Sequence, residues 1–472
     1  MIFKDFKNNA ALLFCISFLF MAFVLFQQGH LPQYDAYYHS AMAERVFEGD
    51  FFSQEFPWLQ ETFLKESYGN MHFLYHLILA PFTLFGFVGV KVLAALLASL
   101  FLVVFYFVLR RFDDRLAFFA SFLMLTSVDF VFRLVLPRAI SFNLILFFLG
   151  LYFLFKKDYK WLFAVGFVYA WSYTGFIFLI VLVLIYYFVN LHNSRNEYMS
   201  LVYSIGGVLA GLVFNPYFPS ILTTYYTQIF KISVGSGVMG GGEWLPMEFR
   251  AFVLGNLFIL ILFFYAVIFF NKKDSTYQFL LIGTLVFGAL TLISRRSIEI
   301  FVPLACAFIV YSFKDLKFSD KNRHFFGSFL FVFVLFGFLA SAFFVGNVVY
   351  SNQNFLVAEC AEFLKENSDK GDVVFNARWD DFPVLFYYNK DNFYLSGLDP
   401  NFMYFTNRDR FILHNNIVYG DEPLSRIKEF NSSFFVSIKD EFQGSIYERA
   451  ELEDGVDLVF EGVGCYVLEV SS

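Results

Sequence analysis

Long apolar stretches recur along the first 350 residues of this chain and are separated by short charged breaks. Each is close to the ~20 residues that a helix needs to cross the ~30 Å hydrocarbon layer of a bilayer, where every backbone polar group must be satisfied internally. We therefore expect a polytopic α-helical membrane protein. The pattern predicts eleven spans, at 10–26, 87–109, 116–128, 139–155, 161–173, 175–190, 199–214, 249–270, 277–293, 299–312 and 325–346.

Two regions allow more than one interpretation. The segment 71–86 contains Pro81 and favours a re-entrant or interfacial helix that leads into the second span. The stretch 161–190 is compatible with one long helix, or with two short helices broken at 172–175, where the sequence reads Ser-Tyr-Thr-Gly. The number of spans, and hence the orientation, depends on this second choice.

Charge indicates the orientation. The first span follows a short basic start and lacks a small-residue cleavage site, so we interpret it as a retained signal anchor. If 161–190 is two spans, fifteen Lys and Arg residues fall inside and seven fall on outside segments before the C-terminal region, as the positive-inside rule requires. We therefore expect a multi-pass protein of the plasma membrane with a cytoplasmic N-terminus and an extracytoplasmic C-terminal region.

Composition divides the chain into two regions with different solvents. The whole chain is 58% hydrophobic and only 16% charged, which suits lipid. Residues 351–472, however, carry 22 acidic and 10 basic side chains. We expect a transmembrane domain at 1–349 and a soluble domain at 350–472, whose acidity argues against nucleic acid or an anionic membrane as its partner.

The C-terminal domain has the pattern of a small α+β unit. We predict a helix, three strands and a terminal hairpin, at 354–367, 372–376, 393–396, 434–438 and 456–470. Of the four cysteines, Cys15 and Cys306 lie in apolar runs. Only Cys360 and Cys465 could pair in a soluble region, and the sequence leaves that pairing open.

Three outside loops are long or polar enough for chemistry. They cover 27–70, 127–141 and 215–247. The first contains Asp35, followed by a stretch, 41–56, that we expect to form an amphipathic helix on the membrane surface. The second contains Asp129. The third is rich in glycine and ends at Glu243, which predicts a mobile flap with a carboxylate at its hinge.

Five motifs follow one another in order along the chain. An acidic residue stands in each of the first two outside loops, a flexible loop ends in Glu, an Arg pair comes late in the membrane domain, and a Trp-Asp motif opens the outside domain. The residues are Asp35, Asp129, Glu243, Arg295, Arg296, Trp379 and Asp380. This order resembles the GT-C glycosyltransferases, specifically the catalytic subunit of oligosaccharyltransferase and its prokaryotic relatives. The resemblance is most specific at 372–382 and 392–400, where the family has a strand, a Trp-Trp-Asp-Tyr-Gly box and a return strand.

The resemblance implies that Asp35, Asp129 and Glu243 are catalytic and ligate one Mg²⁺ or Mn²⁺, since hard cations prefer oxygen ligands. Each also has a simpler interpretation. Asp35 has the position of an interfacial capping residue, and Glu243 that of a solvated polar residue in a loop. Family members commonly add an acid or His two positions after the second carboxylate, where this chain has Val131.

Arg295 and Arg296 stand outside the membrane, against the charge rule that the other loops obey, and therefore need an anionic partner. The resemblance implies that they bind the phosphate of a lipid-linked donor, to which a guanidinium offers two parallel hydrogen bonds. The alternative is an ion pair with Glu299, one turn further on.

Acceptor binding is expected at Trp379 and Asp380, with His39 and His72 as further candidates. The family's box grips the Ser or Thr of an Asn sequon. Here it departs from the family at three positions, Arg378, Asp381 and Phe382. We therefore favour an acceptor other than a sequon, although it could still be a glycan, a lipid or a protein.

The predicted function is inverting, metal-assisted transfer of a sugar from a polyprenyl-phosphate or polyprenyl-diphosphate donor to an acceptor on the extracytoplasmic side. N-glycosylation of Asn sequons by an oligosaccharyltransferase is the alternative within the same class. A transporter or flippase of lipid-linked glycans is the alternative of another class. It should show internal repeats between the two halves of the chain, and we find none.

Overall fold

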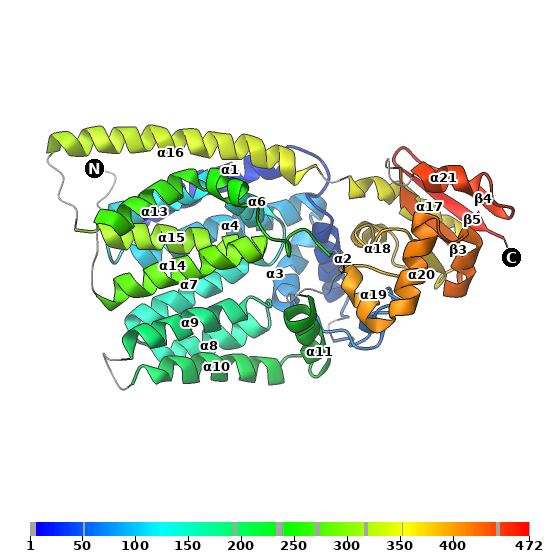
Figure 1. The fold of residues 1–472 in the computed structure, drawn as a ribbon, viewed down its shortest axis with the longest axis horizontal. Coiled ribbons are helices and arrows are strands. Elements are labelled where there is room, and N and C mark those ends of the chain that lie inside the picture. The colour runs from blue at the N-terminus through cyan, green and yellow to red at the C-terminus, as the bar shows by residue number, and fades with distance from the viewer. Residues whose placement is uncertain are drawn as a thin grey trace. The chain divides into compact units, whose positions relative to one another are not determined.

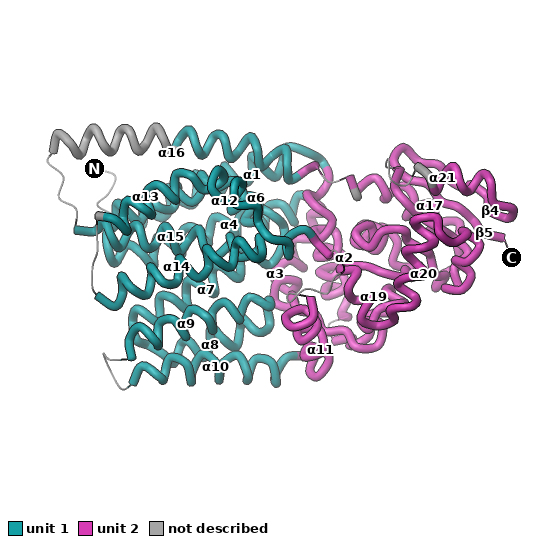
Figure 2. The backbone as a smooth tube through the Cα atoms, in the orientation of Figure 1, with its two compact units in different colours: residues 1–29, 88–215, 242–349 teal, residues 30–87, 216–241, 350–472 magenta. Residues whose placement is uncertain are grey.

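The computed structural model describes the chain except for residues 1–5, 51, 192–195, 233–237, 239, 270–273, 316–319, 352, 440–443 and 472. The glycine-rich stretch expected to be mobile falls largely on 233–237 and 239 and so lies outside the described residues. The chain forms two compact units, coloured separately in Figure 2. Unit 1 comprises 1–29, 88–215 and 242–349, and unit 2 comprises 30–87, 216–241 and 350–472.

Unit 1 is a bundle of helices that lie roughly side by side (Figure 1). The α-helices wholly or mainly within it are α1 Phe6–Leu25, α4 Gly86–Leu109, α5 Asp114–Leu123, α6 Val128–Val135, α7 Ile140–Lys156, α8 Tyr159–Ala170, α9 Phe176–Asn190, α10 Tyr198–Val213, α12 Phe249–Gly255, α13 Leu257–Phe269, α14 Ser275–Ile293, α15 Ile298–Phe313 and α16 Asp320–Val349. Two 3-10 turns join them, η3 Met124–Thr126 and η5 Arg295–Ser297.

A helix occurs at every predicted span, but the count of eleven is not confirmed. Among the described residues, four helices are long and apolar enough to cross a membrane, and two bent helix pairs would raise the number to six. Four other predicted spans, α7 to α10, are helices of only 12 to 17 residues. The protein is a multi-pass membrane protein, and the region 161–190 is two helices rather than one.

Glycine allows α8 and α10 to pack closely. A Cβ atom added at Gly207 would collide with the backbone of Phe163, and one added at Gly211 would lie 2.6 Å from the carbonyl oxygen of Phe167. Small residues at helix contacts are typical of membrane proteins, where close backbone approach replaces the hydrophobic driving force. The two helices therefore pack closely, and α9 contacts both of them.

Unit 2 combines the C-terminal segment with two earlier loops. Its helices are α2 Asp35–Phe47, η2 Phe63–Lys65, α3 Phe73–Thr83, α11 Ser220–Tyr226, the π-helix η4 Thr227–Ile232, η6 Asn354–Val357, α17 Ala358–Asn367, α18 Phe382–Tyr388, α19 Pro400–Thr406, α20 Arg408–Tyr419, η7 Leu424–Phe430 and α21 Gly444–Ala450. Its strands are β1 Val373–Asn376, β2 Phe393–Tyr394, β3 Ser432–Ile438, β4 Val456–Glu461 and β5 Cys465–Val470.

The five strands form one sheet in the order β2-β1-β3-β5-β4. The first three are parallel, with Val374 opposite both Tyr394 and Phe434, and the last two are antiparallel. Its apolar face is covered by helices, and Phe375, Leu395 and Phe435 are fully buried. All the predicted strands and the terminal hairpin are present.

The first outside loop extends this sheet. Leu59 forms a parallel bridge with Tyr394, and the Trp58 indole donates a hydrogen bond to the Lys390 carbonyl at 2.7 Å. An ion pair of 2.9 Å also joins Glu61 to Arg410. These contacts hold the loop that contains Asp35 against the C-terminal segment.

The prediction of an amphipathic surface helix at 41–56 is wrong. The helix in this region is α2, which begins at Asp35, ends at Phe47 and is buried along most of its length. Gly49 follows with a φ of +94°, a conformation that favours glycine and ends the helix. Phe56, the last residue of the predicted helix, is instead fully buried against Tyr68 and Phe386.

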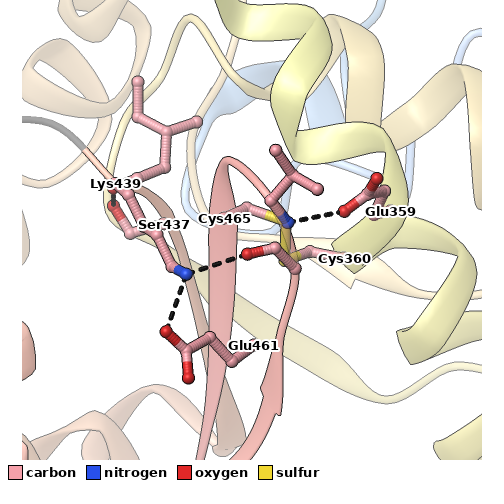
Figure 3. The surroundings of a disulfide bond; sticks show 9 residues. Glu359, Cys360, Ser437, Lys439, Glu461 and Cys465 are labelled. Atoms are coloured by element: carbon pink, nitrogen blue, oxygen red, sulfur yellow. Dashed lines mark hydrogen bonds and ion pairs between the residues drawn. A yellow bond between two sulfur atoms is a disulfide. The ribbon is translucent and has the colours of Figure 1, made fainter.

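A disulfide joins Cys360 of α17 to Cys465 of β5 across 105 residues (Figure 3). The same contact is reinforced by Glu359, which accepts a hydrogen bond from the backbone amide of Val463 at 2.8 Å. The sequence had left this pairing open. Because disulfides persist in oxidising compartments, the bond is compatible with an extracytoplasmic C-terminal domain.

The disulfide can be tested by counting thiols. We expect the denatured, unreduced protein to take up two maleimides, at Cys15 and Cys306, and the reduced protein to take up four. Intact-mass spectrometry measures both numbers. Four additions without reductant would show that Cys360 and Cys465 are free thiols.

Candidate active site

Two bends of the helical bundle meet at Asp129. The pair α5–η3 and α6 is bent by 91°, and the pair α12 and α13 by 85°. Ser127 caps α6 and donates a hydrogen bond of 2.7 Å to the Asn256 side chain at the other bend. A Cβ added at Gly255 would lie 2.5 Å from the Asp129 carboxylate, so the carboxylate is seated against this backbone. Breaks in membrane helices often mark binding sites, because they free backbone polar groups.

A cluster of arginines surrounds Glu243. Its carboxylate lies 2.5 Å from Arg133, 3.0 Å from Arg138 and 3.7 Å from Arg296. The Arg133 Nε also donates a hydrogen bond of 2.7 Å to Glu299. The partner of Glu299 is therefore Arg133, rather than the Arg295–Arg296 pair considered from the sequence.

Arg295 and Arg296 differ in their surroundings. Arg296 is buried, with its guanidinium 4.2 Å from the Trp244 ring centre and 5.1 Å from that of Tyr173. Arg295 is exposed, and its Nε donates to the Pro246 carbonyl at 3.3 Å. The backbone amide of Arg296 donates to the Glu243 carbonyl at 3.3 Å. The end of the third loop is thus fixed to η5 by backbone and side chain together.

The cluster is cationic overall. Burial alone would raise the pKa of the Glu243 carboxyl, but the guanidinium groups of Arg133 and Arg138 hold it below its ordinary value. Glu243 is therefore a carboxylate at neutral pH. The cluster consists of four arginines, Arg133, Arg138, Arg295 and Arg296, and three carboxylates, Asp129, Glu243 and Glu299. It carries one more positive charge than negative charges.

Asp35 begins α2 in unit 2, where it is partly buried in the first helical turn. The ring of the preceding residue, Tyr34, contacts Trp379 edge-on at 5.8 Å between centres. The structure therefore brings two predicted site residues, Asp35 and Trp379, to the same part of unit 2. The Asp380 carboxylate instead accepts two hydrogen bonds from Arg378, at 3.0 and 2.8 Å, so a residue that departs from the family's box holds it.

His39 and His72 lie in one network with a third histidine, His76, in which His39 and His76 are buried and His72 is partly buried. The His39 Nδ1 is 2.8 Å from the His76 Nε2, and the other His76 nitrogen is 2.9 Å from the Asn70 side chain. The ring centres of His39 and His72 are 4.9 Å apart. No role was predicted for His76, because it lies inside an apolar segment. The spacing of four residues from His72, one helical turn, is the signal that could have found it.

The predicted metal ligands are divided between the two units. Asp129 and Glu243 belong to unit 1 and Asp35 to unit 2. In the part of the chain that the structure describes, no group of three or more His, Cys, Asp or Glu side chains is placed to hold a metal ion. Glu243 is bound by arginines.

Sequence comparisons find neither a matching family model nor a matching curated protein. Solved structures share the fold. The apo oligosaccharyltransferase of Archaeoglobus fulgidus is 13% identical with a TM-score of 0.67, covering 98% of this chain and 74% of that one. The same protein has been solved with an acceptor peptide that contains the NVT sequon.

Two further structures match nearly the whole chain. ArnT from Cupriavidus metallidurans is 12% identical with a TM-score of 0.63, covering 98% of both chains. The arabinofuranosyltransferase AftD from Mycobacteria is 13% identical with a TM-score of 0.59, covering 98% of this chain and 40% of that one. All three are GT-C glycosyltransferases, so this chain has the GT-C fold.

Proposed function

We propose that this protein is a membrane glycosyltransferase that transfers a sugar from a polyprenyl-phosphate or polyprenyl-diphosphate donor to an acceptor on the extracytoplasmic side, with inversion at the anomeric carbon. The observation that carries the proposal is the cationic arginine cluster at the end of the third loop, on a GT-C fold. A transporter of lipid-linked glycans would also need such a cluster, but the matching folds belong to transferases.

Sugar transfer explains why a cluster of this charge is useful. When the bond between the anomeric carbon and the phosphate oxygen breaks, negative charge grows on the leaving phosphate, and preorganised guanidinium groups stabilise it. Arg296 suits this role because it is buried, held by two aromatic rings and unable to lose its proton. Arg295, exposed beside it, would contact the same lipid headgroup.

The acceptor must lie on the opposite face of the sugar, near a carboxylate that takes or orients its proton. We assign this role to Asp35 and acceptor binding to the region of Trp379, with Asp380, His39 and His72 supporting it. We further propose that one Mg²⁺ or Mn²⁺ assists transfer by orienting the acceptor and neutralising charge, and Asp35, Asp129 and Glu243 remain its candidate carboxylate ligands. Glu243 could join such a site only after leaving its arginines.

Metal dependence tests this function. We expect the purified protein to consume a polyprenyl-linked sugar from the native host, to stop when EDTA is added, and to resume when Mn²⁺ or Mg²⁺ is restored. The measurement is mass spectrometry of the remaining lipid-linked sugar. Full activity in EDTA, after prolonged dialysis against it, would remove the metal from the proposal while leaving the transferase function standing.

The acceptor distinguishes the two kinds of transferase. The A. fulgidus structure with a sequon peptide makes oligosaccharyltransferase activity the second candidate. Arg378 stands where the family's box has a Trp, and it forms an ion pair with Asp380 of the same box. We therefore expect no glycosylation of a fluorescent Asn-x-Thr peptide. Efficient modification of this peptide, lost when its Thr is changed to Val, would establish the second candidate.

A further inference from the structure

The Glu243 carboxylate occupies a cradle of three guanidinium groups that come from different parts of unit 1. Arg133 lies in α6, Arg138 follows that helix, and Arg296 lies in η5. Even though Arg133 is shared with Glu299, two further guanidinium groups, those of Arg138 and Arg296, surround the single carboxylate of Glu243. The phosphate of a lipid-linked donor matches such a cradle better, because each phosphorus offers two non-bridging oxygens to paired guanidinium hydrogen bonds and a further negative charge develops on the phosphate when the sugar leaves.

Two carboxylates in the cluster differ in accessibility. The side chain of Glu299 is 6% exposed and is bound to Arg133 in the interior, whereas that of Glu243 is 26% exposed. Glu243 also follows Gly240, Gly241 and Gly242, and the space around Gly242 is open, since an added Cβ would meet no atom within 4 Å. Glu243 is thus the anion that can leave the cradle, while Glu299 stays to fix Arg133.

We propose that the cradle of Arg133, Arg138 and Arg296 binds the phosphoryl group of the lipid-linked donor, and that Glu243 occupies it as a placeholder when no donor is bound. This inference rests on the proposed function and extends it in two ways. It adds Arg133 and Arg138 to the donor site, and it makes Glu243 a competitor of the donor rather than a metal ligand in the donor-free protein. Donor binding then displaces the Glu243 side chain from the cradle, while the backbone hydrogen bonds between η5 and the end of the third loop can remain.

The test measures the affinity of the full-length protein in nanodiscs for polyprenyl phosphate, without any sugar transfer. Replacing Glu243 with Gln removes the competing charge, so the Glu243→Gln variant should bind polyprenyl phosphate at least about tenfold more tightly than the wild type. Arg138→Gln should bind it about tenfold more weakly. If the Gln variant cannot be purified, Glu243→Ala answers the same question.

Glu197→Gln is the matched control. Glu197 is also a carboxylate of unit 1 paired with a cation, Lys157 at 2.6 Å, but that cation follows α7, whereas Arg138 precedes it. The seventeen residues of α7 correspond to a separation of about 25 Å. The affinity of the Glu197→Gln variant for polyprenyl phosphate should therefore equal that of the wild type.

Unchanged or weaker binding by Glu243→Gln would overturn the placeholder. A gain in affinity for inorganic phosphate alone would reassign the cradle to free phosphate. Because the affinity is measured without turnover, this test is independent of the proposed function. If Glu243→Gln binds polyprenyl phosphate more tightly but the wild type transfers no sugar, the phosphate site stands and the transferase function is wrong. If the wild type transfers sugar but Glu243→Gln gains no affinity, only the placeholder role of Glu243 is wrong.

Discussion

Replacing Asp35 with Asn is expected to abolish sugar transfer while leaving the protein folded. Asn keeps the shape of the side chain but can neither take a proton nor neutralise a cation, and losing such a group typically lowers the rate by about 10²–10⁴-fold. Asp35 is partly buried in the first turn of α2, so losing its charge should cost no more than about 1 kcal/mol of stability. The rate of donor consumption and the melting temperature in detergent measure the two effects.

Glu66→Gln provides the control for Asp35→Asn. Glu66 is an exposed carboxylate of the same outside loop, and it should be replaceable without loss of transfer. A wild-type rate in Asp35→Asn would remove Asp35 from the site. An equal loss of rate in both variants would mean that the loop responds to any change of charge.

The largest effect on stability is expected for Arg133→Met. The change leaves Glu299 buried without its cation and takes one arginine from Glu243. Breaking a buried ion pair from one side typically costs about 3–5 kcal/mol, because a charge is left uncompensated. We expect a clear fall in melting temperature and in the yield of monodisperse protein.

A double-mutant cycle separates this charge effect from lost packing. Adding Glu299→Gln to Arg133→Met removes the stranded charge, so the double variant should recover much of the lost stability. If the stability losses of the two substitutions instead add, or if Arg133→Met has the melting temperature of the wild type, the buried ion pair does not stabilise the protein as the structure indicates.

Local sequence patterns were sufficient for the elements but not for their lengths. Short apolar runs rich in Val and Phe located the strands of the C-terminal sheet, because strands that are covered on both faces, such as β1 and β3, read as nearly continuous apolar segments. Apolar runs located the helices of unit 1, but they could not show that 161–190 is interrupted, or that α12 and α13 meet at a bend. A bend depends on what packs against it, and the Ser127–Asn256 hydrogen bond joins residues 129 positions apart.

The candidate site was likewise only partly predictable from the sequence. The motif order predicted Asp35, Asp129, Glu243 and the Arg pair, and the structure places Glu243 and Arg296 together. Arg133 and Arg138 could not be assigned from the sequence, since nothing local links them to a glutamate more than a hundred residues away. That Asp35, Asp129 and Glu243 ligate a metal ion stays a prediction.

The most direct test of the transferase function is to follow the donor's own products. The purified protein would be incubated with the host's pool of polyprenyl-linked sugars and native acceptors, and the lipids analysed by mass spectrometry. We predict that wild-type protein converts one lipid-linked sugar into the matching sugar-free polyprenyl phosphate or diphosphate, and that Asp35→Asn leaves it intact. A pool that stays intact with the wild type, while the same glycolipid moves between the leaflets of reconstituted vesicles, would contradict this function and identify a transporter.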